Sequence, residues 1–260
     1  MQGDIIAALH ILTSRSVVCK YLQALGKDWI IYGGFIRYLA TTITRDGIDP
    51  VDPKQPLHDP FNYHKSLSRI IYNMPADVDI MVMNYANIPF IDKMADLKSD
   101  SKLGISSFEK VSTFQTRYGI FHRWKIVEFM DIGNYGTKFV EFEISLCEHY
   151  KDVYDFTVNT LAFNPVYHPS LFSSLSFNPD RMQFTVDEII NDCKAMALVP
   201  LYDYDEPGFE SIGKRMKKLN SHGYQCNTVV NDETTKKNDS LEYKLTLIVA
   251  QAKQFQLNLH

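Results

Sequence analysis

The chain has 260 residues, of which 45% are hydrophobic and 22% are charged, and its formal net charge is −4. This length is enough for one large or two modest domains with a proper core, and the composition excludes a largely disordered chain. The acidic balance excludes a protein that coats nucleic acid by bulk charge, so a polyanionic partner has to meet a local basic patch or a metal ion.

The first predicted elements are helical. Apolar residues at a mixed spacing of three and four predict a helix or a broken helix pair over residues 5–25, ended by Gly26. Residues 29–32 form a short buried strand that feeds a helix over residues 35–43. Four prolines predict an irregular surface insertion over residues 46–60. Strands then follow over residues 77–83, 111–129 and 138–146, with a short helix over residues 91–97 between the first two.

The pattern turns helical after Pro165. Helices are predicted over residues 186–198, 209–219 and 241–257. We therefore divide the chain into a mixed α/β domain over residues 1–165 and a smaller helical domain over residues 166–260.

Cysteine usage and the N-terminus indicate the compartment. The four cysteines are scattered and show no paired zinc spacing, which indicates a reducing environment. The first residues lack a basic segment followed by an apolar one, and no run is long enough to span a bilayer. We expect an intracellular, cytoplasmic protein that does not contact a membrane.

Two stretches place acidic residues at strand spacing. In "ADVDIMV", Asp77 and Asp79 share one face of a strand, and in "FVEFEIS", Glu141 and Glu143 do the same. If the two acidic faces align, the carboxylates converge and can bind magnesium, which prefers hard oxygen ligands. The alternative is that the aspartates cap a strand at the surface and the glutamates form a solvated strand edge.

A glycine pair stands where a strand ends and a helix begins, in "YGGFIRYLA". Gly33 and Gly34 fit a tight strand-to-helix turn, because glycine reaches backbone angles that other residues avoid. They also fit a phosphate seat, because the free N–H groups at a helix start attract anions. Taken alone, the pair favours the turn.

Four pieces in order, "GGFIR", "DVDI", "FEIS" and "DFTVNTLAFNP", resemble the head domain of the tRNA CCA-adding enzymes and bacterial-type poly(A) polymerases. These enzymes belong to the polymerase-β-like nucleotidyltransferase superfamily, and the resemblance covers about residues 28–165. It implies an α+β fold: a nucleotidyltransferase head with a mixed β-sheet flanked by helices, followed by a smaller mainly helical domain.

The resemblance also implies roles for particular residues. Asp77, Asp79 and Glu143 would be the catalytic carboxylates and would bind Mg²⁺ or Mn²⁺, with Glu141 as the alternative third ligand. The nucleotide would be bound by Gly33, Gly34, Arg37, Asp155 and Asn159, and by Lys214 and Arg215 on a neck-like helix. For Arg37, the alternative to a phosphate contact is a structural contact. Helix capping is the alternative for Asp155 and Asn159, and a solvated basic face is the alternative for the neck helix.

Some positions depart from the family's pattern. Val153 and Tyr154 stand where the family has basic residues, and Tyr38 follows Arg37 where the family commonly has aspartate. Glu210 lies five residues before Arg215 and four before Lys214, which shifts the pair that reads the base by one position. The chain is thus either a divergent or an impaired member of the family.

The expected function is template-independent nucleotide transfer to an RNA 3′ end, most simply poly(A) tailing in mRNA processing with ATP as donor. The alternatives are tRNA CCA addition, transfer to a small molecule or a protein, and a non-catalytic subunit. The helical part is short compared with the domains that hold tRNA in the family. We therefore expect a homo-oligomer or a protein partner to supply further RNA-binding surface.

Overall fold

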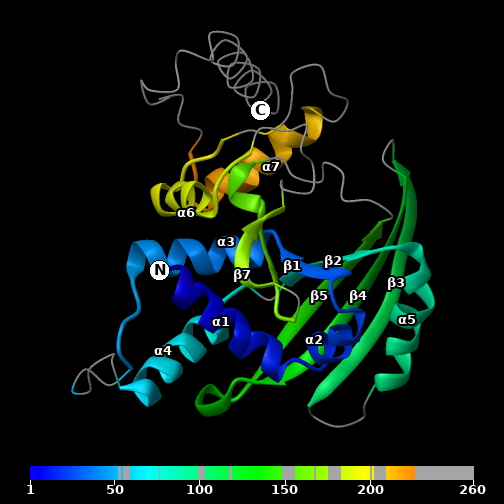
Figure 1. Cartoon of the computed structure of the whole chain (residues 1–260), viewed down its shortest axis with the longest axis horizontal. Coiled ribbons are helices and arrows are strands. Elements are labelled where there is room, and N and C mark those ends of the chain that lie inside the picture. Colours follow the sequence, from blue (N-terminus) through cyan, green and yellow to red (C-terminus); the bar gives the residue numbers. More distant parts are fainter. Residues whose placement is uncertain are drawn as a thin grey trace.

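The computed structural model describes residues 1–51, 54, 59–75, 77–98, 103–116, 119–147, 156–166, 168–174, 183–199, 201 and 209–225. It is a mixed α/β structure in which helices flank a seven-stranded mixed sheet of order β3-β4-β5-β2-β1-β6-β7 (Figure 1). The predicted mixed sheet with flanking helices is therefore confirmed. The strands are β1 (Trp29–Tyr32), β2 (Asp77–Met83), β3 (Gly104–Thr116), β4 (Gly119–Asp131), β5 (Thr137–Cys147), β6 (Leu161–Asn164) and β7 (His168–Ser173).

The centre of the sheet holds one parallel strand pair. β2 runs parallel to β5, whereas the other pairs in the described sheet are antiparallel. A parallel pair needs a crossover between its strands, and the long β3–β4 hairpin with the short helices before it provides this connection. The crossover brings the acidic stretches of β2 and β5, more than sixty residues apart in the sequence, into direct contact.

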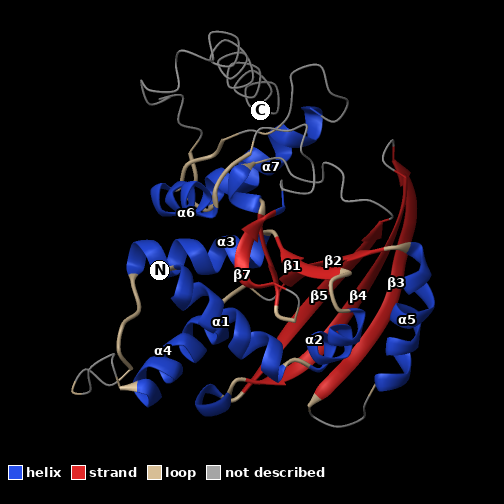
Figure 2. Ribbon diagram, in the orientation of Figure 1, coloured by secondary structure: helices blue, strands red, loops and turns tan. Residues whose placement is uncertain are grey.

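Seven α-helices are described, and most pack against one face of the sheet (Figure 2). α1 and α2 form the predicted broken pair, since Ser16 leaves the helical conformation and its side chain caps α2 by accepting a hydrogen bond from Cys19 N. The helices are α1 (Gln2–Arg15), α2 (Val17–Leu22), α3 (Gly34–Thr41), α4 (Pro60–Asn73), α5 (Ile88–Asp92), α6 (Val186–Ala195) and α7 (Phe209–Ser221).

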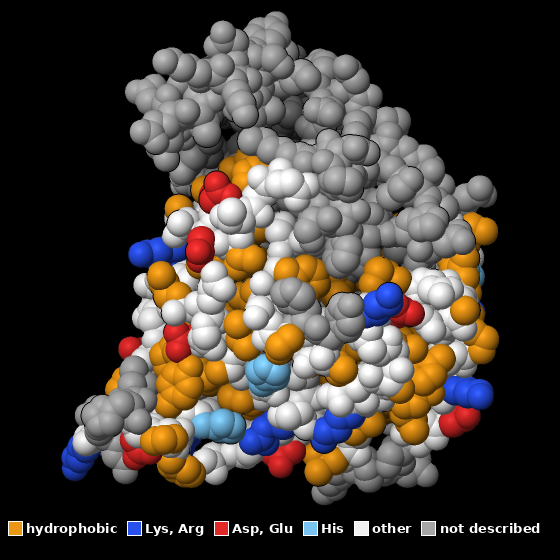
Figure 3. Space-filling view, in the orientation of Figure 1, with side chains coloured by type: hydrophobic (Ala, Val, Ile, Leu, Met, Phe, Trp, Pro, Cys, Tyr) orange, Lys and Arg blue, Asp and Glu red, His pale blue; other side chains and the backbone are white. Residues whose placement is uncertain are grey.

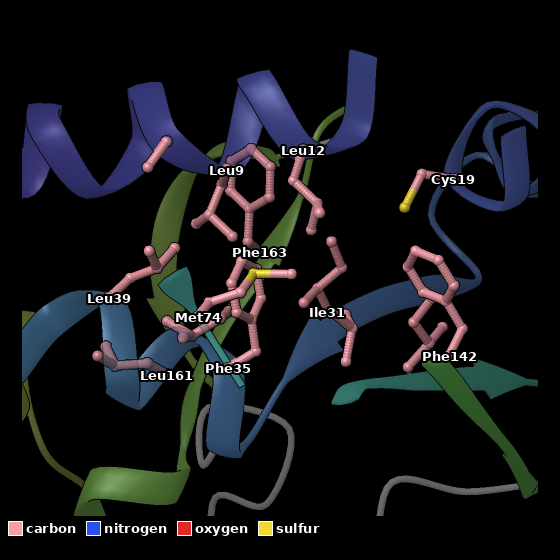
Figure 4. Packing of buried hydrophobic residues seen from close by; sticks show 14 of the residues in the cluster. Leu9, Leu12, Cys19, Ile31, Phe35, Leu39, Met74, Phe142, Leu161 and Phe163 are labelled. Carbon is pink, nitrogen blue, oxygen red and sulfur yellow. The ribbon is translucent and has the colours of Figure 1, made fainter. Parts of the chain in front are cut away.

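The core lies between this helical layer and the sheet. Alternate residues of β2 point into it, so that Val78, Ile80 and Val82 are fully buried while Asp77 is exposed. Figure 4 shows Leu9 and Leu12 of α1 facing Ile31 and Phe163 of the sheet. The same cluster includes residues of α6 and α7, so the described helices after β7 pack on the same core as the sheet.

The structure corrects the sequence predictions at two places. The helix α4 was not predicted: Pro60, placed at the end of the predicted loop, occupies the first turn of this helix, where its missing N–H costs nothing, and Asp59 caps the helix. The chain does not turn helical directly after Pro165, because β7 forms the edge of the sheet beside β6. The division into two domains stays a prediction, and the helix predicted over residues 241–257 lies outside the described residues.

Among the described helices, one bent pair has some membrane-spanning potential. In the described part of the chain, no single helix is long and apolar enough to cross a bilayer. The segments Gln2–Arg15 and Val17–Leu25, bent by 90° at their junction, reach the required length and composition only together.

Candidate active site

The parallel register of β2 and β5 brings the acidic residues together in pairs. Asp77 lies beside Glu141, and Asp79 lies beside Glu143, at the same level of the two strands. Neighbouring strands are about 4.8 Å apart, so these four side chains occupy one small area on the face of the sheet opposite the helical core. The alignment expected from the two acidic stretches is therefore present.

The glycine turn lies directly against Asp79. Gly33 has φ +74° and ψ −139°, and a Cβ atom built on it would lie 2.7 Å from Oδ2 of Asp79. The Gly34 N–H donates a hydrogen bond to the same oxygen over 3.3 Å, at the first residue of α3. The two glycines thus serve a tight turn, and this turn places a helix N-terminus over a carboxylate that is aligned with Glu143.

The environment of Asp79 disfavours its charge. Burial raises the pKa of the Asp79 carboxyl; the Gly34 hydrogen bond and Arg37 oppose this shift, and the negative charges of Glu143 and Asp77 add to it. A buried carboxylate beside two others is destabilised unless a cation neutralises it. Asp79 is therefore the carboxylate of this group that has most to gain from a nearby cation.

The two glutamates of β5 already have cationic partners on β4. Arg123 Nε lies 3.1 Å from Glu143 Oε1, and Lys125 Nζ lies 2.8 Å from Glu141 Oε2. Sequence reasoning missed both cations, although Arg123 and Lys125 alternate in a predicted strand as the glutamates do. The area is consequently a mixed patch of four acidic and two basic side chains.

The donor set fits a divalent cation in its chemistry. Carboxylate oxygens are the ligands that Mg²⁺ and Mn²⁺ prefer, and Asp77, Asp79 and Glu143 supply them from adjacent strands. Within the residue ranges described, no group of three or more acidic, histidine or cysteine side chains is gathered closely enough to bind an ion as it stands. Binding by all three carboxylates thus requires a side chain to turn, and Glu143 is bound to Arg123 instead.

Arg37 links the glycine turn to later parts of the chain. Its guanidinium donates a hydrogen bond to Oδ1 of Asn159, and its Cζ atom lies 5.6 Å from the centroid of the Tyr224 ring. Asn159 ends a 3₁₀-helix, η6 (Thr157–Asn159). Two predicted nucleotide-binding residues, Arg37 and Asn159, therefore contact each other, in agreement with the structural role considered for Arg37.

Tyr224 is a member of this cluster that the sequence did not reveal. It is only 4% exposed, and its hydroxyl is hydrogen-bonded to Oγ1 of Thr41 at the end of α3. Burial raises the pKa of Tyr224 to about 12, so the hydroxyl stays protonated. An aromatic residue after a basic helix is no signal by itself, because its partners Arg37 and Thr41 lie more than 180 residues earlier.

The remaining predicted residues are further along the chain. Asp155 lies outside the described residues. Lys214 and Arg215 belong to α7; the side chain of Arg215 is exposed, and that of Lys214 lies outside the described part. The exposed Lys217 and Lys218 follow on the same helix. Figure 3 shows the other basic side chains of the described surface scattered over the face in view.

No family model and no curated protein matches this sequence.

Proposed function

We propose that the chain is a template-independent RNA 3′-end nucleotidyltransferase that transfers NMP from an NTP, with poly(A)-type tailing as its main activity. One observation carries the proposal: Asp79 lies beneath the Gly33–Gly34 turn at the start of α3 and beside Glu143 of the parallel neighbour strand. This arrangement agrees with the roles implied by the resemblance to the head domain of CCA-adding enzymes and poly(A) polymerases.

In this proposal, Asp77, Asp79 and Glu143 hold two divalent cations. When bound, such cations lower the pKa of the attacking 3′-hydroxyl and neutralise charge on the pyrophosphate that leaves. The register of β2 and β5 supports Glu143 as the third ligand, because Glu143 and not Glu141 is level with Asp79.

In the same proposal, the glycine turn binds the triphosphate of the NTP. Gly33 and Gly34 have no side chains of their own that would obstruct a triphosphate, and the start of α3 favours negative charge. Arg37 and Asn159 orient each other at this end of the helix, which keeps the guanidinium near the glycine turn. The protein thus positions the donor and leaves the hydroxyl of the acceptor as the attacking group.

RNA binding would use the basic side chains of α7. The net charge is −4, and the exposed basic residues Arg215, Lys217 and Lys218 on α7 form one small cluster. A single copy should therefore hold RNA weakly and with a steep dependence on salt. We propose that a second copy or a protein partner adds RNA-binding surface.

A transfer assay tests the proposal. Purified protein is incubated with Mg²⁺ or Mn²⁺ and each labelled NTP, with oligo(A) RNA, tRNA or no acceptor. Labelled oligo(A) supports RNA tailing, and labelled tRNA alone points to CCA addition. Label on the protein or on a small molecule, or no transfer at all, would reject the proposal.

The carboxylate variant identifies the site. Asp79→Asn removes a ligand charge at nearly constant volume, and the loss of several kcal/mol of transition-state stabilisation predicts a rate about a thousandfold lower. Asp96→Asn, at an exposed position of the 3₁₀-helix η4 (Lys93–Leu97), is the control and should retain the wild-type rate. If Asp79→Asn transfers nucleotide at the wild-type rate, the catalytic site is assigned wrongly.

A further inference from the structure

β4 places two cations on the same face of the sheet as the candidate active site, and each binds one glutamate of β5. The side chains of Arg123 and Glu143 are both 38% exposed, whereas those of Lys125 and Glu141 are 45% and 26% exposed. Ion pairs that are this accessible to water contribute little stability, since water solvates the separated charges. Each glutamate can therefore exchange its cationic partner for another at a small cost.

The two ion pairs differ in their position relative to Asp79. Glu143 is level with Asp79 on the adjacent strand, whereas Glu141 is level with the exposed Asp77. Glu143 also adds to the negative charge that acts on Asp79. The partner of Glu143 thus determines whether a third carboxylate is available beside Asp79.

We propose that Arg123 is a positioning residue that holds Glu143 until a divalent cation binds beside Asp79, and that the cation then takes Glu143 over from Arg123. This inference rests on the proposed function, because it assumes that the carboxylates bind a metal ion. Arg123 and the cation compete for the same carboxylate, so Arg123 lowers the affinity for the free cation. It would prevent the three carboxylates from gathering around an ion in the absence of substrate.

Competition between Arg123 and the cation for Glu143 predicts a change in metal affinity, which can be measured without enzymatic activity. Removing the guanidinium leaves Glu143 available and also removes a positive charge that repels the cation. For side chains as exposed as these, we expect Arg123→Gln to raise the affinity for Mn²⁺ by about three- to tenfold. Mn²⁺ alone is the probe, and free Mn²⁺ is measured by electron paramagnetic resonance without nucleotide or RNA.

Lys125 provides a matched control. Lys125→Gln removes the same charge from a position two residues along β4, but from the ion-pair partner of Glu141. Lys125 is also level with Glu143 and interacts with its charge, so we expect Lys125→Gln to raise the Mn²⁺ affinity, but clearly less than Arg123→Gln does. We expect Arg123→Lys, which keeps the charge, to stay within twofold of the wild type. An increase for Lys125→Gln as large as that for Arg123→Gln would overturn the inference, since general charge would then explain both.

A double-mutant cycle tests whether Arg123 acts through Glu143. Glu143→Gln should weaken Mn²⁺ binding at least fivefold, and Arg123→Gln should then have less than a twofold effect in that background. A full effect of Arg123→Gln without Glu143 would overturn the inference, as would unchanged binding by Glu143→Gln. Thermal unfolding measured by circular dichroism shows which variants fold. If Arg123→Gln does not fold, the Mn²⁺ affinity of Glu143→Gln tests the inference.

The outcomes separate this inference from the proposed function. If the wild type transfers nucleotide but Arg123→Gln binds Mn²⁺ as the wild type does, the inference fails and the proposed function stands. If the Mn²⁺ affinities change as expected but no NTP is transferred to any acceptor, the proposed function fails and the competition between Arg123 and the cation stands.

Discussion

The contact between Gly33 and Asp79 can be tested by adding a single methyl group. Gly33→Ala places an L-residue at φ +74° and ψ −139°, close to a region that only glycine readily adopts, at a cost of about 1 to 3 kcal/mol. Its Cβ atom would also lie 2.7 Å from Oδ2 of Asp79, so the carboxylate has to move. Losing the Gly34 hydrogen bond to this oxygen adds about 1 kcal/mol.

Gly47→Ala isolates the effect of backbone strain. Gly47 has φ +77° and ψ −174°, and a Cβ atom there would meet nothing within 4 Å. We expect urea unfolding to show that Gly33→Ala costs about 1 kcal/mol more than Gly47→Ala. In an Asp79→Ala background the excess should disappear, because the carboxylate is absent.

Two results would contradict a contact between the Gly33 turn and Asp79. Equal costs for Gly33→Ala and Gly47→Ala would show that Asp79 does not restrict the turn. A cost of Gly33→Ala that stays the same after Asp79→Ala would show that the methyl group meets another part of the structure. The m-values of the two variants should be equal, which shows that the denatured state has not changed between them.

Two further predictions concern the buried polar groups. Glu128 is 1% exposed and accepts hydrogen bonds from Ser16 Oγ and from the N–H groups of Val17 and Val18, yet burial raises its pKa above the usual 4.5. The folded state therefore binds the Glu128 proton more tightly than the unfolded state. The stability that protonated Glu128 contributes is present below pH 4.5 and is lost as the pH rises through the pKa of the folded state. Urea midpoints of wild type and Glu128→Gln between pH 4 and 8 should show the wild type losing stability relative to the variant as the pH rises; a constant difference would contradict this. At the Arg37 cluster, Tyr224→Phe removes the hydrogen bond to Thr41 and should cost about 1 kcal/mol, whereas Tyr224→Leu also removes the ring and should cost roughly 2 kcal/mol or more. Thermal and urea unfolding of the two variants measure the difference, and equal costs would mean that the ring does not stabilise Arg37.

Much of the secondary structure was predictable because it depends on local patterns. The strand over Asp77–Met83 has alternating burial that follows directly from its residue types, and its bounds were predicted correctly. The helix α4 was not predicted, because Pro60 and its neighbours resemble a loop when Asp59 is not recognised as a cap. β7 was missed for a related reason: a short edge strand with a proline shows little alternation.

The candidate site shows the same division between local and tertiary information. The shared face of Asp77 and Asp79 and the helix that follows Gly33 could be predicted from local sequence, because they depend on backbone periodicity and on the conformational freedom of glycine. The position of Glu143 beside Asp79 could not be predicted in this way, since strand pairing and register depend on contacts between residues far apart in the chain. The same holds for the pairing of Glu143 with Arg123, because a β4 side chain meets a β5 side chain only after the sheet has formed.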